Sequence, residues 1–178
     1  MATAIYGPAF ILGMLATIWT DLRERRIPNW ITGPLFLGGL FAAWHRAGWK
    51  GLEDSLMGVG MAVVIWILPF IRAGAAMGGG DQKLALAAGA ALGWQGTLLF
   101  CLLAGIGSVV LFAWTILREA GGWRGFVERV KLGWLLLKGG VREDDAMAHG
   151  IKTVPMAPIL APAAITAWLL QFKGALAL

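Results

Sequence analysis

Residues 84–117 read LALAAGAALGWQGTLLFCLLAGIGSVVLFAWTIL, an uncharged run of 34 residues. A membrane-spanning helix needs about 20 apolar residues, with roughly 17–25 tolerated. The run is therefore too long for one helix, and it could hold two helices with a turn near residues 93–96. Four other uncharged runs each have the length of a single span. They cover residues 1–20, 27–44, 55–71 and 153–172.

The composition is that of a membrane protein. Of the 178 residues, 58% are hydrophobic and 14% are charged, whereas soluble domains average about 45–50% and about 25%. The 26 glycines and ten tryptophans also indicate a membrane protein, because glycine is enriched in membrane helices and tryptophan at membrane interfaces. We predict an all-α fold, a polytopic membrane helix bundle. Residues 1–178 should form one domain, because no long soluble stretch could form a second.

The distribution of positive charge decides how the long run is divided. Seven of the 15 Lys and Arg residues lie in the loop 118–152, three in 21–29 and two in 72–83. Cytoplasmic loops collect positive charge, and these three loops share one side only if the long run forms two helices. We therefore predict six transmembrane helices with both termini outside. Mixed basic and apolar residues in 118–152 also predict an interfacial helix there.

The net charge of +5 does not point to nucleic acid, because the cations flank apolar segments. They are expected to set the topology and to meet anionic lipid headgroups, which makes membrane lipids the predicted partner. The single cysteine, Cys101, and the isolated histidines His45 and His149 have no metal-ligand spacing, so no metal site is predicted. Residues 1–20 lack the basic start of a signal peptide, so we expect this helix to be retained.

Two aspartates border the apolar runs. Asp21 follows the first run, and Asp81 follows Gly78, Gly79 and Gly80. A carboxylate near a bilayer is costly and often marks a catalyst, a counter-ion or an ion path. The alternatives are an anchor for Asp21, a helix cap for Asp81 and a flexible linker for the glycines. With six spans, both carboxylates lie at the cytoplasmic ends of helices, level in depth.

Asn29 and the prolines of the last run have two interpretations each. Asn29 follows Pro28, which favours a helix start with Asn29 as its cap. Pro155, Pro158 and Pro162 make the last helix irregular, as a packing kink or as an edge that binds substrate. Serine-nucleophile, Walker A and zinc-protease motifs are missing.

The stretch DLRERRIPN from Asp21, followed by GGGDQKL from Gly78, resembles the type IV prepilin peptidases. These are GxGD-type aspartyl proteases (peptidase A24) of the bacterial inner membrane. The resemblance implies Asp21 and Asp81 as the catalytic pair, and no cofactor. It implies an active-site loop of Gly78, Gly79, Gly80 and Lys83, with Asn29 and Pro155 as possible substrate edges.

The resemblance also implies a substrate, a prepilin with a short basic leader before an apolar helix, cut at the cytoplasmic face. The pilus assembly machinery would be a further partner. Larger members have an extra region with paired Cys-x-x-Cys motifs and N-methylate their product. This chain lacks that region and looks like the short form associated with tight-adherence (Flp) pili, so methyl transfer does not follow from the resemblance.

In such a pair, one aspartate would activate a water while the other, protonated, polarises the scissile carbonyl. The sequence leaves open which residue does which. It also leaves open two functions without catalysis. A transporter or channel subunit would use a buried aspartate as an ion path, and a pilus or secretion scaffold would tolerate loss of either aspartate.

Overall fold

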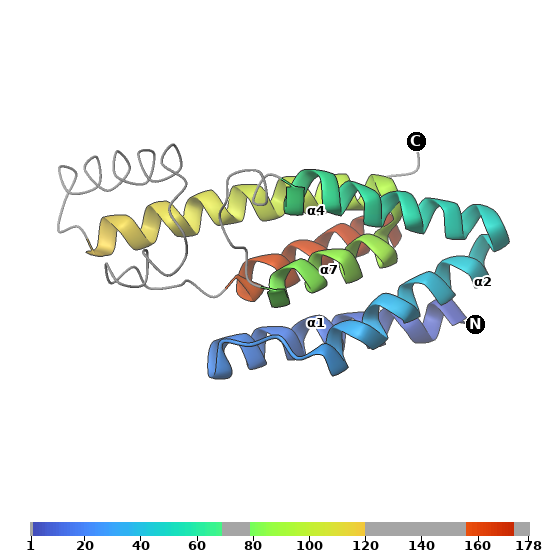
Figure 1. Ribbon diagram of the computed structural model, residues 1–178, viewed down its shortest axis with the longest axis horizontal. Helices are drawn as coiled ribbons and strands as arrows, with labels where there is room; N and C mark the ends of the chain where they lie inside the picture. The colour runs from blue at the N-terminus through green and yellow to red at the C-terminus, as the bar shows by residue number, and fades with distance from the viewer. Residues whose placement is uncertain (1, 69–78, 120–155, 173–178) are drawn as a thin grey trace.

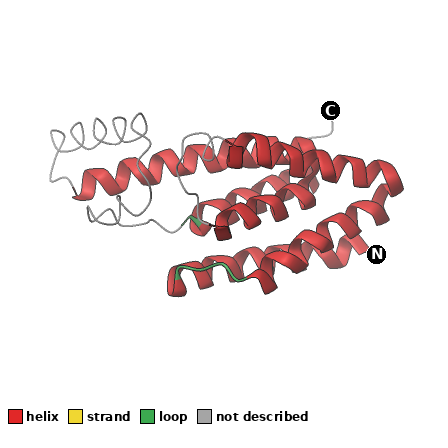
Figure 2. Cartoon of the chain, viewed as in Figure 1, coloured by secondary structure: helices red, strands yellow, loops and turns green. Residues whose placement is uncertain are grey.

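The computed structural model describes residues 2–68, 79–119 and 156–172 (Figure 1). These residues form four α-helices and one short π-helical segment, with no strand among them (Figure 2). The helices are α1 (Ala2–Glu24), α2 (Asn29–Ala62), α4 (Gly79–Glu119) and α7 (Ala157–Phe172), and η1 (Val63–Ile67) continues α2. The prediction of an all-α fold is confirmed for this part of the chain. The predicted interfacial helix within 118–152 lies almost wholly outside it.

α2 is two helices joined by a sharp turn. Ala47 (φ −140°, ψ 19°) and Gly48 (φ 58°, ψ −134°) leave helical geometry, and helix resumes directly after them. Gly48 has the positive φ that glycine adopts without steric cost. In Figure 1 the second half of α2 runs back alongside the bundle from this turn. Residues 45–54, which separate the uncharged runs 27–44 and 55–71, are therefore helical except at this turn.

α4 is divided in the same way at Gly93 (φ 65°, ψ −174°), inside the turn predicted near residues 93–96. Figure 1 shows the green first half and the yellow second half running in opposite directions. The Asp54 carboxylate of α2 accepts a hydrogen bond from the Trp94 amide at 3.3 Å. Thr97 Oγ1 donates to the Gly93 carbonyl at 2.5 Å. The two-helix division of the long run is confirmed.

Small residues let the helices approach closely. A Cβ on Gly39 would lie 2.9 Å from the backbone of Ala90, and a Cβ on Gly58 would clash with the Gly89 carbonyl oxygen. Close backbone contact at Gly and Ala is typical of helix packing in membranes. The interior between the helices holds fully buried Phe10, Met14, Leu84, Leu92, Phe100 and Leu160.

The outer surface is strongly apolar. Leu12, Trp19, Trp30, Leu102 and Val109 are each at least 60% exposed. By length and composition, one stretch of the described residues, Gly79–Leu111, is long and apolar enough to cross a membrane, and it contains the reversal at Gly93. Only 28% of its most apolar window is buried. A core helix of a soluble protein would be mostly buried, so an apolar exterior of this kind is typical of a bundle in lipid.

Candidate active site

The site lies at the end of the bundle where α1 ends and where α2, α4 and α7 begin (Figure 1). The N-termini of three helices therefore converge on one place. Each contributes partial positive charge and unpaired backbone N–H groups, and both favour negative charge in the space between them. This end of the bundle is therefore suited to hold carboxylates away from bulk water.

Asp21 is held by α7. Its side chain lies in the last turn of α1 and is only 7% exposed. The Asp21 Oδ2 atom accepts a hydrogen bond of 2.9 Å from the backbone N–H of Ala157, the first residue of α7. Asp21 thus caps a helix 136 residues away in the sequence. Sequence reasoning could not find this partner, because a backbone amide has no signature in the sequence.

The connector from α1 to α2 forms one wall of the site. Arg25 has a positive φ of 51° and its amide donates to the Asp21 carbonyl at 3.0 Å, which ends α1. Ile27 is buried. Pro28, in extended conformation, is the N-cap of α2, and no side chain caps this helix. The predicted capping role of Asn29 is therefore wrong, because Pro28 takes that position and Asn29 is the first helical residue.

Asn29 makes a different contact. Its Oδ1 atom accepts a hydrogen bond of 2.7 Å from the ammonium group of Lys83 in α4. This bond joins two predicted site residues that are 54 positions apart. Both side chains are exposed at the end of the bundle.

The glycines before Asp81 are helical rather than part of a loop. α4 begins at Gly79, which places Gly79, Gly80 and Asp81 in its first turn. The prediction of an active-site loop is wrong for Gly79, Gly80 and Lys83, because the helical backbone of α4 begins two residues before Asp81 and continues past Lys83. A Cβ on Gly80 would lie 2.9 Å from the Cβ of Ile27, so the glycine permits close contact with the connector. Gly78 and Pro155 lie outside the described residues.

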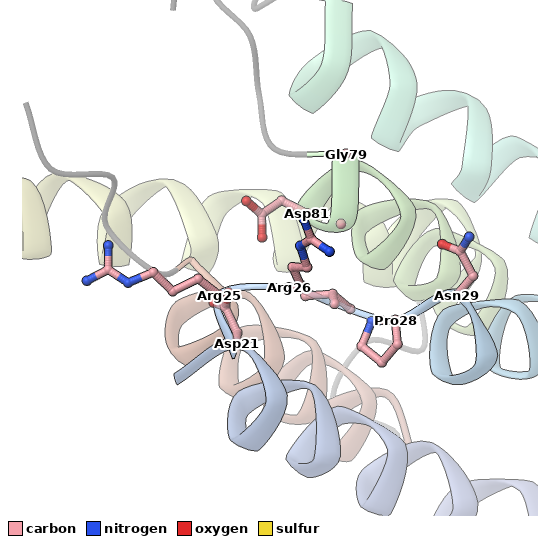
Figure 3. Close-up of a pocket in the computed structure, with 9 residues that line it drawn as sticks. Asp21, Arg25, Arg26, Pro28, Asn29, Gly79 and Asp81 are labelled. Carbon is pink, nitrogen blue, oxygen red and sulfur yellow. The ribbon is translucent and has the colours of Figure 1, made fainter. Parts of the chain in front are cut away.

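Asp21 and Asp81 line one pocket of about 410 Å³. Figure 3 shows Asp81 and Gly79 of α4 on one side of it and the connector, with Arg25, Arg26 and Pro28, on the other. The remaining lining residues are Ile27, Asn29 and Gly80. From the sequence, Arg25 and Arg26 were expected only to set the membrane topology and to meet lipid headgroups, although they belong to the same motif as Asp21.

The two carboxylates influence each other. Asp81 precedes the uncharged run that begins at Leu84, so it lies at the end of the apolar part of its helix. Burial, and secondly the charge of Asp21, raise the pKa of the Asp81 carboxyl from its ordinary 3.8 to about 6. Two neighbouring carboxylates resist ionising together. Below about pH 6 the arrangement therefore favours a pair that shares one proton. No group of His, Cys, Asp and Glu in the described residues could hold a metal ion.

Residues 9–113 match the model of the type IV leader peptidase family. This region includes both aspartates and more than half of the chain, and the protein belongs to that family. Over 110 residues the chain is 31% identical to the prepilin leader peptidase/N-methyltransferases of Aeromonas hydrophila and of Aeromonas salmonicida (strain A449). The matched region covers 55% of this chain and only 38% of each relative. No solved structure matches the chain.

Proposed function

We propose that this protein is a membrane-embedded aspartyl endopeptidase that removes the short basic leader from type IV prepilins of the Flp type. The observation that supports it most is the meeting of Asp21 and Asp81 in one pocket, within the region that matches the leader peptidase family. Cleavage would take place at the cytoplasmic face of the bacterial inner membrane. The proposal covers leader cleavage and does not extend to the methyl transfer in the names of the Aeromonas relatives.

The proposed topology has six transmembrane helices. Chain reversals at Ala47–Gly48 and at Gly93 divide α2 and α4, so six helical segments follow one another through the described residues. Apolar side chains cover their outer faces. In this topology the pocket faces the side on which the basic loops lie, and anionic lipid headgroups surround its entrance.

The contacts of the pair suggest separate roles. Asp21 accepts a backbone N–H at the N-terminus of α7, which favours a carboxylate at that place. In the proposed reaction, the Asp21 carboxylate takes a proton from a water molecule. Asp81, whose pKa is raised to about 6, would hold the shared proton. We assign Asp21 as the general base and Asp81 as the general acid.

The reaction then follows in two steps. Asp21 takes a proton from water as the water oxygen bonds to the scissile carbonyl carbon, and Asp81 gives its proton to the carbonyl oxygen. This yields a tetrahedral gem-diol. Asp21 next donates its proton to the amide nitrogen as the C–N bond breaks, while Asp81 regains a proton from the re-forming carboxyl group. The pair ends as it began.

Charge around the pocket limits how the leader can bind. Arg25 and Arg26 line the pocket, so the cations of a basic leader are repelled from its interior. The leader would extend over the membrane surface toward anionic headgroups, with only the scissile peptide reaching the aspartates. The substrate's apolar helix would remain in the bilayer. The acidic residues 143–145, which could also attract the leader, lie outside the described residues.

A cleavage assay tests the proposal. The chain is co-expressed with a Flp-type prepilin, and the gel mobility of the prepilin is followed for the wild type, Asp21→Asn and Asp81→Asn. Glu53→Gln is the matched control, because Glu53 is an exposed carboxylate in the second half of α2, beside the Gly48 turn. We expect each aspartate variant to lose about 10²–10⁴-fold in cleavage rate, the range of general acid–base catalysis. Cleavage that survives in both variants would refute the catalytic role of the aspartate pair, and a wild type that cleaves no prepilin would favour a scaffold or transporter.

A further inference from the structure

The two catalytic candidates come from segments that are not continuous with each other. Asp21 belongs to the end of α1 and Asp81 to the first turn of α4. Their separation therefore depends on how the start of α4 is held against the α1–α2 connector. Two contacts at this place carry the argument. One is the close approach of Gly80 to Ile27, and the other is the 2.7 Å hydrogen bond from Lys83 to Asn29.

Lys83 is directed at Asn29. Residues two apart on a helix do not face each other, so Lys83 and Asp81 point to different sides of α4. Both causes of the altered Asp81 pKa, burial and the Asp21 charge, raise it, whereas a close ammonium group would lower it. The influence of Lys83 on Asp81 is therefore mechanical, through the position of the helix.

Asn29 is able to receive this bond because of the local backbone. Pro28 serves as the N-cap of α2 without a side-chain hydrogen bond. The Asn29 amide oxygen is thus not used to cap its own helix and accepts from Lys83 instead. Asn29 also lines the pocket, so the bond closes the pocket wall between the start of α2 and the start of α4.

We propose that the Lys83–Asn29 hydrogen bond is a positioning contact, which holds the first turn of α4 at the separation from Asp21 that the shared-proton chemistry requires. The inference rests on the proposed peptidase function. Neither residue is assigned a chemical step. A displacement of the order of 1 Å between reacting groups lowers rates by about 100-fold, so a single surface hydrogen bond can be decisive for catalysis.

The first test is a double-mutant cycle on the full-length purified protein in detergent. Cleavage of a prepilin is measured for Lys83→Met, Asn29→Ala and the double variant, with Lys83→Arg as the conservative rescue. Lys50→Met is the control, because Lys50 is an exposed lysine beside the Gly48 turn. We expect each single change to lower kcat by about 10–100-fold, with the double variant no worse than the poorer single variant. Lys83→Arg should stay within a few-fold of the wild type.

The pH profile separates positioning from simple destabilisation. If the carboxylates move apart, Asp21 raises the pKa of Asp81 less, so the basic limb of kcat/KM moves to lower pH in Lys83→Met. The cations that line the pocket with this pair are Arg25 and Arg26 from the connector, whereas the Lys83 ammonium group is bonded to Asn29. The proposal would be overturned if the losses in kcat of the two single variants multiplied in the double variant. It would also be overturned if the basic limb of kcat/KM in Lys83→Met stayed at the wild-type pH.

A second readout does not depend on activity. Asp21→Cys and Asp81→Cys are combined in a Cys101→Ala background, and the rate of crosslinking by a short bifunctional thiol reagent is measured. Adding Lys83→Met should slow crosslinking several-fold, whereas Lys50→Met should not. Equal rates would refute the positioning role even if the chain cleaved prepilin. A wild type that cleaves no prepilin, with crosslinking slowed by Lys83→Met, would overturn the peptidase proposal and leave the contact in place.

Discussion

Replacing Gly80 by alanine should separate the two aspartates by a distance that follows from the structure. The added Cβ would lie 2.9 Å from the Ile27 Cβ and 3.3 Å from the Ile27 amide nitrogen. Carbon atoms in ordinary contact are about 3.5–4.0 Å apart, so α4 must move from the connector by roughly 0.6–1.1 Å. Ile27 cannot turn away, because its Cβ is bonded directly to the backbone.

Such a movement changes the position of Asp81, the next residue, relative to Asp21. A misplacement of about 1 Å costs about 100-fold in rate when reacting groups must be aligned. We therefore expect Gly80→Ala to lower kcat for prepilin cleavage by about 100-fold. The fold should survive, because the change lies at the end of a helix and adds one methyl group.

Gly60→Ala is the matched control. Gly60 lies in the second half of α2 and is not among the pocket-lining residues, and a Cβ there meets no atom of the described residues within 4 Å. Alanine also has a higher helix propensity than glycine, by up to about 1 kcal/mol in a helix interior. Gly60→Ala should cleave prepilin at nearly the wild-type rate. The reasoning fails if the two variants are within threefold of each other, measured as initial rates at saturating substrate in detergent.

Two further predictions concern stability. Asp81→Asn should raise the thermal unfolding temperature at pH 8 but leave it nearly unchanged at pH 4. The folded-state pKa of the Asp81 carboxyl is raised from 3.8 to about 6, so this carboxyl lowers the stability of the fold as the pH rises through that interval. Equal gains in unfolding temperature at pH 4 and pH 8 would contradict this. Gly93→Ala should destabilise the bundle by about 1–2 kcal/mol or more, because φ is 65° and the Asp54 carboxylate occupies the Cβ position. Gly105→Ala, where a Cβ meets nothing within 4 Å among the described residues, is its control in denaturant unfolding.

The helical class and the division of the long apolar run followed from the sequence. Charge placement required two helices in residues 84–117, and the chain does reverse at Gly93. These features depend on average composition and on the sign of charge in loops, which are local properties of a sequence. Asp21 and Asp81 were also identifiable, because carboxylates beside apolar runs are rare and costly.

The contacts that shape the site were decided only by the tertiary structure. The cap on α7 by Asp21, the Gly80–Ile27 contact and the Lys83–Asn29 bond each join segments far apart in the chain. The sequence placed Asn29 as a cap and the glycines in a loop, since local propensity is all that a short motif conveys. Which groups meet depends on how four helices pack at one end of a bundle. The sequence thus determined which residues could do chemistry, and packing determined how far apart they are held.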